Sequence, residues 1–129
     1  MNVGVEGKEF ADATFTVEAT RVARFADAVG ATGTSVPATF ATAAEFTVFP
    51  AVVADPEVAL DFSRVVHADQ EYEFERPLRV GETVTVRSRI AGARSKGGQS
   101  FLAIETTLVD AAGSTIVTAR ATMLERGVG

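Results

Sequence analysis

The side chain best suited to proton transfer is His67, the only histidine in this chain of 129 residues. An imidazole titrates near neutral pH and can serve as a lone general base. Asp69 and Glu71 follow it at alternate positions, so in a strand the three side chains would share one face. We therefore interpret His67 as a structural histidine stabilised by carboxylates. Hydrogen bonding to a ligand at the mouth of a site, or action as a base near a subunit interface, are its functional alternatives.

Few other side chains could carry out chemistry. The absence of cysteine excludes a disulfide framework, a thiol nucleophile and a cysteine-based zinc site. Thr34 and Ser35 have no paired base that would make either a nucleophile, and we expect them to cap a helix. Asp27 is expected to point to solvent. The sequence therefore offers no catalytic residue of its own, and no cofactor or metal site is expected.

Gln70 and Tyr72 share the parity of apolar Phe74 in the same predicted strand. Their polar ends should lie beneath or beside a buried helix, where they need hydrogen-bond partners. We therefore favour a structural role for both, and contact of Gln70 with a ligand amide is the alternative.

The elements that must position these groups begin with a short strand and a helix. After a weakly patterned arm, alternation predicts a strand over residues 14–17. Helical spacing then predicts a helix over residues 18–29, which ends at Gly30. Its expected apolar face consists of Val22, Phe25, Ala26 and Val29.

A second helix is predicted over residues 38–48. Pro37 fits a first helical position, with residues 38–48 following, and Pro50 should stop the helix. Its apolar stripe consists of Phe40, Ala44 and Val48. Since Glu45 is the only charged residue in this segment, we expect the helix to be buried on most sides.

From Val65 onward the apolar period changes from that of a helix to two. Four strands are predicted, over residues 65–75, 83–90, 100–109 and 115–124, with turns at residues 81–82, 97–98 and 111–114. The acidic row of the first strand and the pair Arg87 and Arg89 of the second could neighbour each other on a solvated face. A strand, two helices and four strands indicate an α+β fold in one domain, residues 1–129.

Composition limits the classes of partner. Hydrophobic residues make up 47% of the chain and its mean hydropathy is positive, which suggests that apolar surface meets another molecule. A net charge of −5 argues against nucleic acid, which needs clustered Lys and Arg. No apolar run approaches the roughly 20 residues of a membrane span, and no signal peptide is evident. We expect a cytoplasmic protein.

Three ordered segments resemble the MaoC-like (R)-specific hydratases and dehydratases. These segments are TFTVEATRVARFADAVG, VPATFATAAEF and VVHADQEYEFERPLRVGETVTVRSRI. The resemblance covers most of the chain and is to the N-terminal, FAS1-like dehydratase type of domain. It implies a hot-dog fold, in which an antiparallel sheet wraps around a central helix.

The catalytic signature of that family, roughly G-D-x-N-P-x-H, should lie between Gly30 and Pro37. Here that gap holds only ATGTSV. Dehydration of a 3-hydroxyacyl thioester needs a base for the C2 proton, an acid for the leaving hydroxyl and donors to the thioester oxygen. The resemblance therefore implies that a catalytic partner subunit supplies the Asp and the His.

By this resemblance the chain is the non-catalytic subunit of a heteromeric enoyl-thioester hydratase or 3-hydroxyacyl-thioester dehydratase, and helps to form the acyl tunnel. The expected ligand is acyl-CoA or an acyl group on acyl carrier protein, and the expected assembly is a heterodimer or heterotetramer. The residues expected to contact the ligand are Pro37, Ala38, Thr39, Phe40, Phe46, Phe49, His67 and Gln70.

Two alternatives remain open. Hot-dog thioesterases often activate water with a carboxylate on the central helix, and Glu45 is the only candidate for that role. A homodimer could instead bind acyl thioesters without chemistry.

Overall fold

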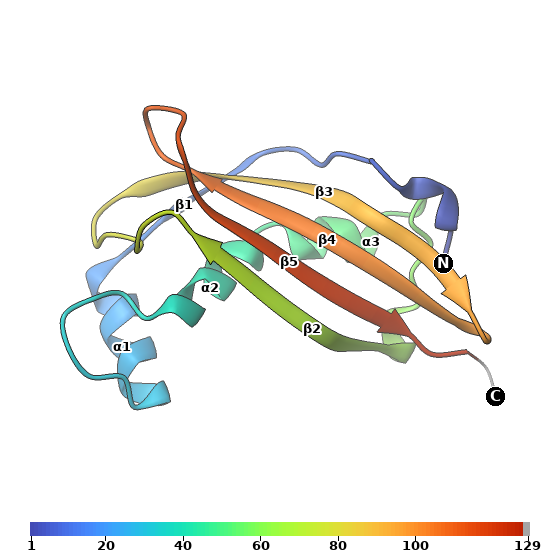
Figure 1. Cartoon of the computed structure of the whole chain (residues 1–129), viewed down its shortest axis with the longest axis horizontal. Helices are drawn as coiled ribbons and strands as arrows, with labels where there is room; N and C mark the ends of the chain where they lie inside the picture. The colour runs from blue at the N-terminus through green and yellow to red at the C-terminus, as the bar shows by residue number, and fades with distance from the viewer. Residues whose placement is uncertain (128–129) are drawn as a thin grey trace.

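The computed structural model describes residues 1–127, in which the alternating segments pair as one antiparallel sheet (Figure 1). Its strands are β1 (Ala13–Thr16), β2 (Val65–Phe74), β3 (Thr83–Lys96), β4 (Gln99–Val109) and β5 (Thr115–Glu125). They lie in the order β1-β3-β4-β5-β2, so β1 and β2 form the two edges. The predicted antiparallel sheet is confirmed, and β3 continues past its predicted end at Ile90.

The predicted turns are found where glycine permits them. Gly97 and Gly98, between β3 and β4, have φ angles of 60° and 78°. Gly81, before β3, has a φ of 91°. Residues with a side chain rarely adopt these left-handed angles, so glycine at these positions determines where the chain reverses.

The helices are α1 (Ala19–Val29), α2 (Ala41–Glu45) and α3 (Phe49–Ala54), with 3₁₀ turns η1 (Val3–Val5), η2 (Ala38–Phe40) and η3 (Phe62–Arg64). Helices α2 and α3 lie against one face of the sheet (Figure 1). The predicted stripe of Phe40, Ala44 and Val48 is buried, as are inward residues of β1, β3, β4 and β5, whereas those of β2 are at most partly buried. The core therefore lies between the sheet and η2, α2 and α3.

Helix α1 occupies the predicted residues and ends at Gly30, whose φ of 71° closes it in the left-handed conformation. Val22 is buried against the core, but Val29 is 53% exposed. The prediction that Val29 shares the buried face is wrong, because the last turn of α1 extends away from the sheet (Figure 1).

The single helix predicted over residues 38–48 is broken. Residues 46–48 form a turn, in which the amides of Thr47 and Val48 donate to carbonyls three residues back. Pro50 does not stop a helix but lies in the first turn of α3. Since proline has no N–H to donate, it disrupts a continuing helix but fits the first turn of a new one.

The predicted neighbourhood of the acidic row and the basic pair is also wrong. Strands β4 and β5 separate β2 from β3. Arg89 forms an ion pair with Glu105 of β4 at 3.1 Å, and Arg87 pairs with Asp12 at 3.2 Å. Two strands therefore separate the acidic row on β2 from these arginines.

Candidate functional site

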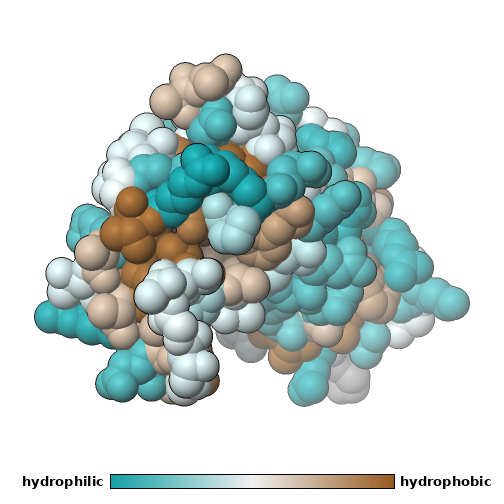
Figure 2. Space-filling model, turned by 60° about the vertical axis from the view of Figure 1, so that its left-hand side comes forward, coloured by the Kyte–Doolittle hydropathy of each residue, from teal (hydrophilic) through white to brown (hydrophobic). Residues whose placement is uncertain are grey.

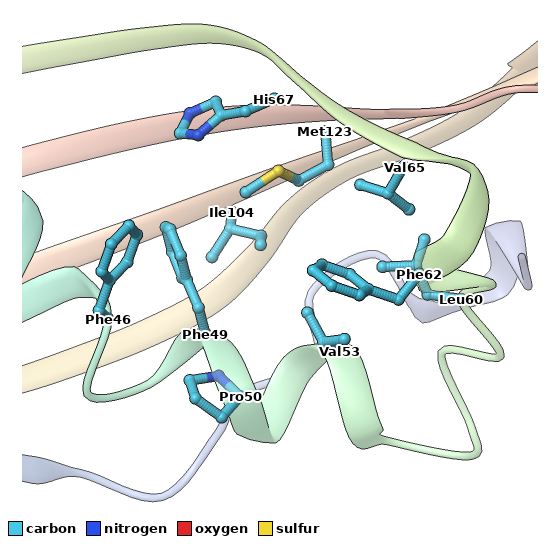
Figure 3. A pocket seen from close by; sticks show the side chains of 10 residues that line it. All are labelled: Phe46, Phe49, Pro50, Val53, Leu60, Phe62, Val65, His67, Ile104 and Met123. Carbon is cyan, nitrogen blue, oxygen red and sulfur yellow. The ribbon is translucent and has the colours of Figure 1, made fainter.

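A hollow of about 660 Å³ lies between the sheet and α3 (Figure 3). Almost all of its wall is apolar. The lining residues are Phe46, Phe49, Pro50, Val53, Leu60, Phe62, Val65, His67, Ile104 and Met123. The turn after α2, helix α3, η3 and three strands thus contribute to one apolar site.

Three of the predicted ligand-contacting residues meet in this hollow. The rings of Phe46 and Phe49 lie with their centroids 5.7 Å apart, and His67 faces them from β2 (Figure 3). Phe49 is 7% exposed, whereas Phe46 is 56% exposed. Phe62, in η3, is 66% exposed. The hollow therefore has a closed apolar floor and opens to solvent beside Phe46 and Phe62.

A β-bulge determines where His67 points. In the pairing of β2 with β5, His67 lies opposite Met123 and Asp69 opposite Thr122, so Ala68 is the extra residue. The bulge reverses the alternation, and His67 joins the inward face instead of the face of Asp69. The prediction of a shared face with Asp69 and Glu71 is therefore wrong, since His67 lines the hollow.

A buried carboxylate lies behind the hollow, on α2. Glu45 is 0% exposed. Its Oε1 accepts a hydrogen bond of 2.7 Å from the Tyr72 hydroxyl, and its Oε2 accepts one of 3.1 Å from the amide of Gln70. The Tyr72 hydroxyl also bonds to Thr42 of α2. The predicted partners for the polar ends of Gln70 and Tyr72 are therefore on α2.

Burial sets the electrostatics of this cluster. It raises the pKa of Glu45, because the charged form loses its hydration, and the two donated hydrogen bonds and nearby His67 oppose that rise. Burial also raises the pKa of Tyr72 well above its ordinary value. Gln70 Oε1 is buried without a hydrogen-bond partner among the described residues. The cluster thus ties α2 to β2 and leaves one acceptor free.

The other predicted contacts lie elsewhere. Phe40 is 1% exposed and packs against the rings of Phe15 and Phe25, with centroids 5.9 Å and 5.4 Å away. Pro37 precedes η2, which has no side-chain cap, so the predicted capping by Thr34 and Ser35 is wrong. Pro37, Ala38 and Thr39 are not among the residues that line the hollow.

Several lining residues were not predicted. Leu60 and Phe62 are apolar residues in a largely polar loop before β2, which is a signal that the sequence carries. Ile104 and Met123 could be found only from strand register, because Met123 enters the site by lying opposite His67.

The hollow lies beside the free edge of the sheet. Val65 and His67 belong to β2, which has a neighbour on only one side. Val66, between them, is 38% exposed. Exposed Phe46, Phe62 and Val66 thus mark one region where apolar surface meets an open strand edge.

Elsewhere on the surface, a view toward the α1 end shows hydrophobic groups gathered in a few places among hydrophilic ones (Figure 2).

Within residues 1–127, the structure brings together no cluster of three or more His, Asp or Glu side chains that could hold a metal ion. In the same part of the chain, none of the helices combines the length and hydropathy needed to cross a bilayer.

Comparison with known proteins places this geometry in context. Residues 5–119 match the family described as FAS1-like, dehydratase domain region. A UPF0336 protein of Leifsonia xyli subsp. xyli is 37% identical over 127 residues, which cover 93% of this chain and 81% of the relative.

Solved structures show the same fold at low identity. The C-terminally truncated HadBC (3R-hydroxyacyl-ACP dehydratase) complex from Mycobacterium tuberculosis contains a chain that superposes with a TM-score of 0.81 at 18% identity, covering 93% of this chain and 96% of that one. A MaoC-like dehydratase from Rhodospirillum rubrum superposes with a TM-score of 0.63 at 16% identity, covering 96% and 94%. These similarities confirm the predicted hot-dog fold and the resemblance to MaoC-like proteins.

Proposed function

This chain belongs to the FAS1-like dehydratase domain region family, and from that premise we propose that it is the non-catalytic subunit of a heteromeric (R)-specific enoyl-thioester hydratase or 3-hydroxyacyl-thioester dehydratase. In this role it holds part of the acyl chain, while a second hot-dog subunit carries the acid and the base.

The observation that carries the proposal is an apolar hollow that opens beside a free strand edge. Phe49, Ile104 and Met123 form a wall with almost no polar surface, which suits an alkyl chain rather than a polar substrate. Since no strand within residues 1–127 pairs with the outer side of β2, a second sheet can add there and cover the open side of the hollow. The HadBC complex, a 3R-hydroxyacyl-ACP dehydratase, is a precedent for two such subunits acting together.

The side chains near the hollow favour a supporting role. Hydration or dehydration moves two protons and therefore needs an acid and a base within reach of the thioester. Between Gly30 and Pro37 the chain has neither Asp nor His. Among the described residues that line the hollow, His67 is the one ionisable side chain, and none is a carboxylate. His67 can hydrogen-bond the pantetheine arm or the thioester of the ligand, whether that ligand is acyl-CoA or an acyl group on acyl carrier protein.

We assign the other predicted contacts to roles in the same complex. Phe46 and Phe49 would pack on the acyl chain. The free Oε1 of Gln70, behind the hollow, could accept a hydrogen bond from an amide. Backbone N–H groups at Ala38 and Thr39, at the start of η2, would donate to a ligand oxygen on the partner's side, with Pro37 and Phe40 holding that turn.

Burial of Glu45 speaks against a thioesterase. Both of its carboxylate oxygens accept hydrogen bonds from partly buried donors, and the residue itself is 0% exposed. A base that activates water must reach that water directly. A structural role in joining α2 to β2 is the better account of Glu45.

The experiment that tests the function is hydration of crotonyl-CoA and of longer enoyl-CoA. The assay compares the chain alone, the hot-dog hydratase that co-purifies with the untagged chain from its native host, and the two together. We expect no turnover by the chain alone. In the mixture we expect a rise that is largest for long acyl chains. Robust turnover by the chain alone, or a partner whose activity is independent of the chain, would refute the proposal.

A substitution that fills the hollow tests whether the acyl chain binds there. Val53→Trp, on α3, places a large ring in the hollow and should depress turnover of long enoyl-CoA far more than turnover of crotonyl-CoA. Val80→Trp is the matched control, because Val80 is 50% exposed and does not line the hollow. Equal effects of the two variants on long substrates would contradict the assignment of the hollow as the acyl site.

A further inference from the structure

The outer face of β2 carries the carboxylates of Asp69, Glu71 and Glu73, and Glu75 continues the row just past the end of the strand. All four side chains are exposed. Across the sheet Glu71 lies opposite Arg120, but that guanidinium donates to Glu105 of β4 at 3.2 Å. Within residues 1–127, none of the four carboxylates forms an ion pair. The row therefore places negative charge without an ion-pair partner among the described residues along the free edge of the sheet.

The same edge has features of a surface that becomes covered. β2 is ten residues long, and in the described part of the chain no strand lies beside its outer backbone N–H and C=O groups. Phe62 and Val66, at its start, are 66% and 38% exposed. A long edge flanked by exposed apolar side chains invites pairing with another strand.

We propose that the acidic face of β2 selects the partner by charge: it accepts a hot-dog subunit whose edge strand carries Lys or Arg on its outer face, and it disfavours a second copy of this chain. This inference rests on the proposed function, and it adds what distinguishes the partner from the chain itself.

Strand geometry explains why a second copy is disfavoured. In two antiparallel strands related by a two-fold axis, residues that lie opposite each other must point to the same face of the joined sheet. After the bulge at Ala68, the outward side chains of β2 are the odd-numbered ones, and all of them are acidic. In a symmetric pair, each outward acid of one strand must therefore lie opposite an outward acid of the other. An axis at Glu71 places Glu71 opposite itself and Asp69 opposite Glu73. An axis at Tyr72 places Glu71 opposite Glu73 and Asp69 opposite Glu75.

No shift of register within this stretch removes the conflict. Every two-fold axis from residue 70 to residue 73 brings carboxylates together, with Cβ atoms about 5 Å apart. Like charges placed opposite each other in an interface suppress the wrong pairing. A strand with Lys or Arg at the opposing outward positions would convert each of these contacts into an attractive pair.

The test uses this chain and a charge-reversed copy of it. The edge variant carries Asp69→Lys, Glu71→Lys and Glu73→Lys. The control variant carries Glu6→Lys, Glu18→Lys and Asp27→Lys, which change the net charge equally at exposed positions away from β2. Circular dichroism first verifies that each variant is folded, and sedimentation at low ionic strength then measures association of the wild type alone, each variant alone and each mixture with the wild type.

We expect the wild type with the edge variant to form a one-to-one dimer. Its Kd should lie about a hundredfold or more below that of the wild type or the edge variant with itself, and added salt should weaken it. The wild type mixed with the control variant should not gain association. If the edge variant fails to fold, Asp69→Asn, Glu71→Gln and Glu73→Gln replace it, and this neutral variant should self-associate more tightly than the wild type.

A tight wild-type homodimer joined through β2, or a folded edge variant that does not associate with the wild type, would overturn the proposal. The hydration assay separates this failure from failure of the proposed function. An edge variant that supports the catalytic partner as well as the wild type does would refute selection by charge and leave the function intact. A chain that associates with its edge variant but activates no hydratase would refute the function alone.

Discussion

Replacement of Glu45 tests whether its carboxylate has a structural or a catalytic role. Glu45→Ala removes the acceptor of two buried hydrogen bonds, those from Tyr72 at 2.7 Å and from Gln70 at 3.1 Å. A buried polar group that loses its partner costs about 1–3 kcal/mol. The Tyr72 hydroxyl keeps its bond to Thr42, so the larger part of the cost falls on Gln70. We expect a loss of about 2–4 kcal/mol in the free energy of unfolding.

Glu45→Gln should cost much less. The new amide oxygen can still accept from Tyr72, and its NH₂ group can donate to Gln70 Oε1 once the amide of Gln70 turns over. In the wild type Gln70 Oε1 is buried without a hydrogen-bond partner among the described residues, so rotation of the Gln70 amide makes use of a free acceptor. We expect a loss within about 1 kcal/mol, which is the usual net worth of one hydrogen bond.

The pH dependence gives an independent check on Glu45. Its pKa is raised in the folded state by burial, so the folded protein holds this proton more tightly than the unfolded chain does. The resulting stability is fully present below the ordinary pKa of a glutamate and is lost as pH rises through the folded pKa. Glu45→Gln removes this dependence, so the variant should gain relative to the wild type as pH increases over that window.

Urea unfolding followed by circular dichroism measures these differences, since the chain has no tryptophan for fluorescence. Glu45→Ala should also lower Tm by roughly 5–15 °C. A Gln variant as unstable as the Ala variant, with the same pH dependence as the wild type, would refute the hydrogen-bonding argument. Hydrolysis of acyl-CoA by the wild type that disappears in Glu45→Gln would show instead that Glu45 is a catalytic base.

Three further predictions concern the core, a turn and an ion pair. Phe40→Ala should cost about 3–5 kcal/mol of unfolding free energy, because Phe40 is 1% exposed. Phe46 is 56% exposed, so Phe46→Ala should barely change stability and should instead weaken binding of a fluorescent long-chain acyl-CoA. Gly81→Ala should lower stability by about 1 kcal/mol or more in thermal unfolding, because its φ is 91°. Hydrogen bonds of 2.8 Å and 3.0 Å from Arg76 hold the pKa of Glu82 below its ordinary value. The stability from Glu82 should therefore be present above that ordinary pKa and be lost as pH falls through the lowered one, and acid unfolding of Glu82→Gln should lack that loss.

Much of the fold follows from local patterns. The strands after Val65 have period two, and their turns contain glycines with left-handed φ angles, so both signals lie within a few neighbouring residues. The end of α1 at Gly30 has the same local origin. The resemblance to MaoC-like proteins, and with it the hot-dog fold, depends on motifs that are themselves contiguous in the chain.

The candidate site was predicted only in part. The sequence identified Phe46, Phe49 and His67, because aromatic residues near a buried helix and a single histidine are conspicuous. It assigned His67 to the wrong face, since a bulge at Ala68 leaves no mark in the apolar pattern. It also merged η2, α2 and the turn over residues 46–48 into one helix and did not predict α3, because the run of helix-forming residues up to Val48 does not show where backbone bonding changes.

What the sequence alone determined is the order of the five strands and of α1, together with the absence of an Asp and His pair before the central helical segment. What only the tertiary structure decided is which residues meet: the pairing of His67 with Met123, the burial of Glu45 beneath Gln70 and Tyr72, and the position of β2 at the edge. The physical reason is the separation along the chain of the residues that interact. Turn and strand preferences arise between neighbours along the chain, whereas register, bulges and strand order are chosen by side chains far apart in sequence that must pack in the same core.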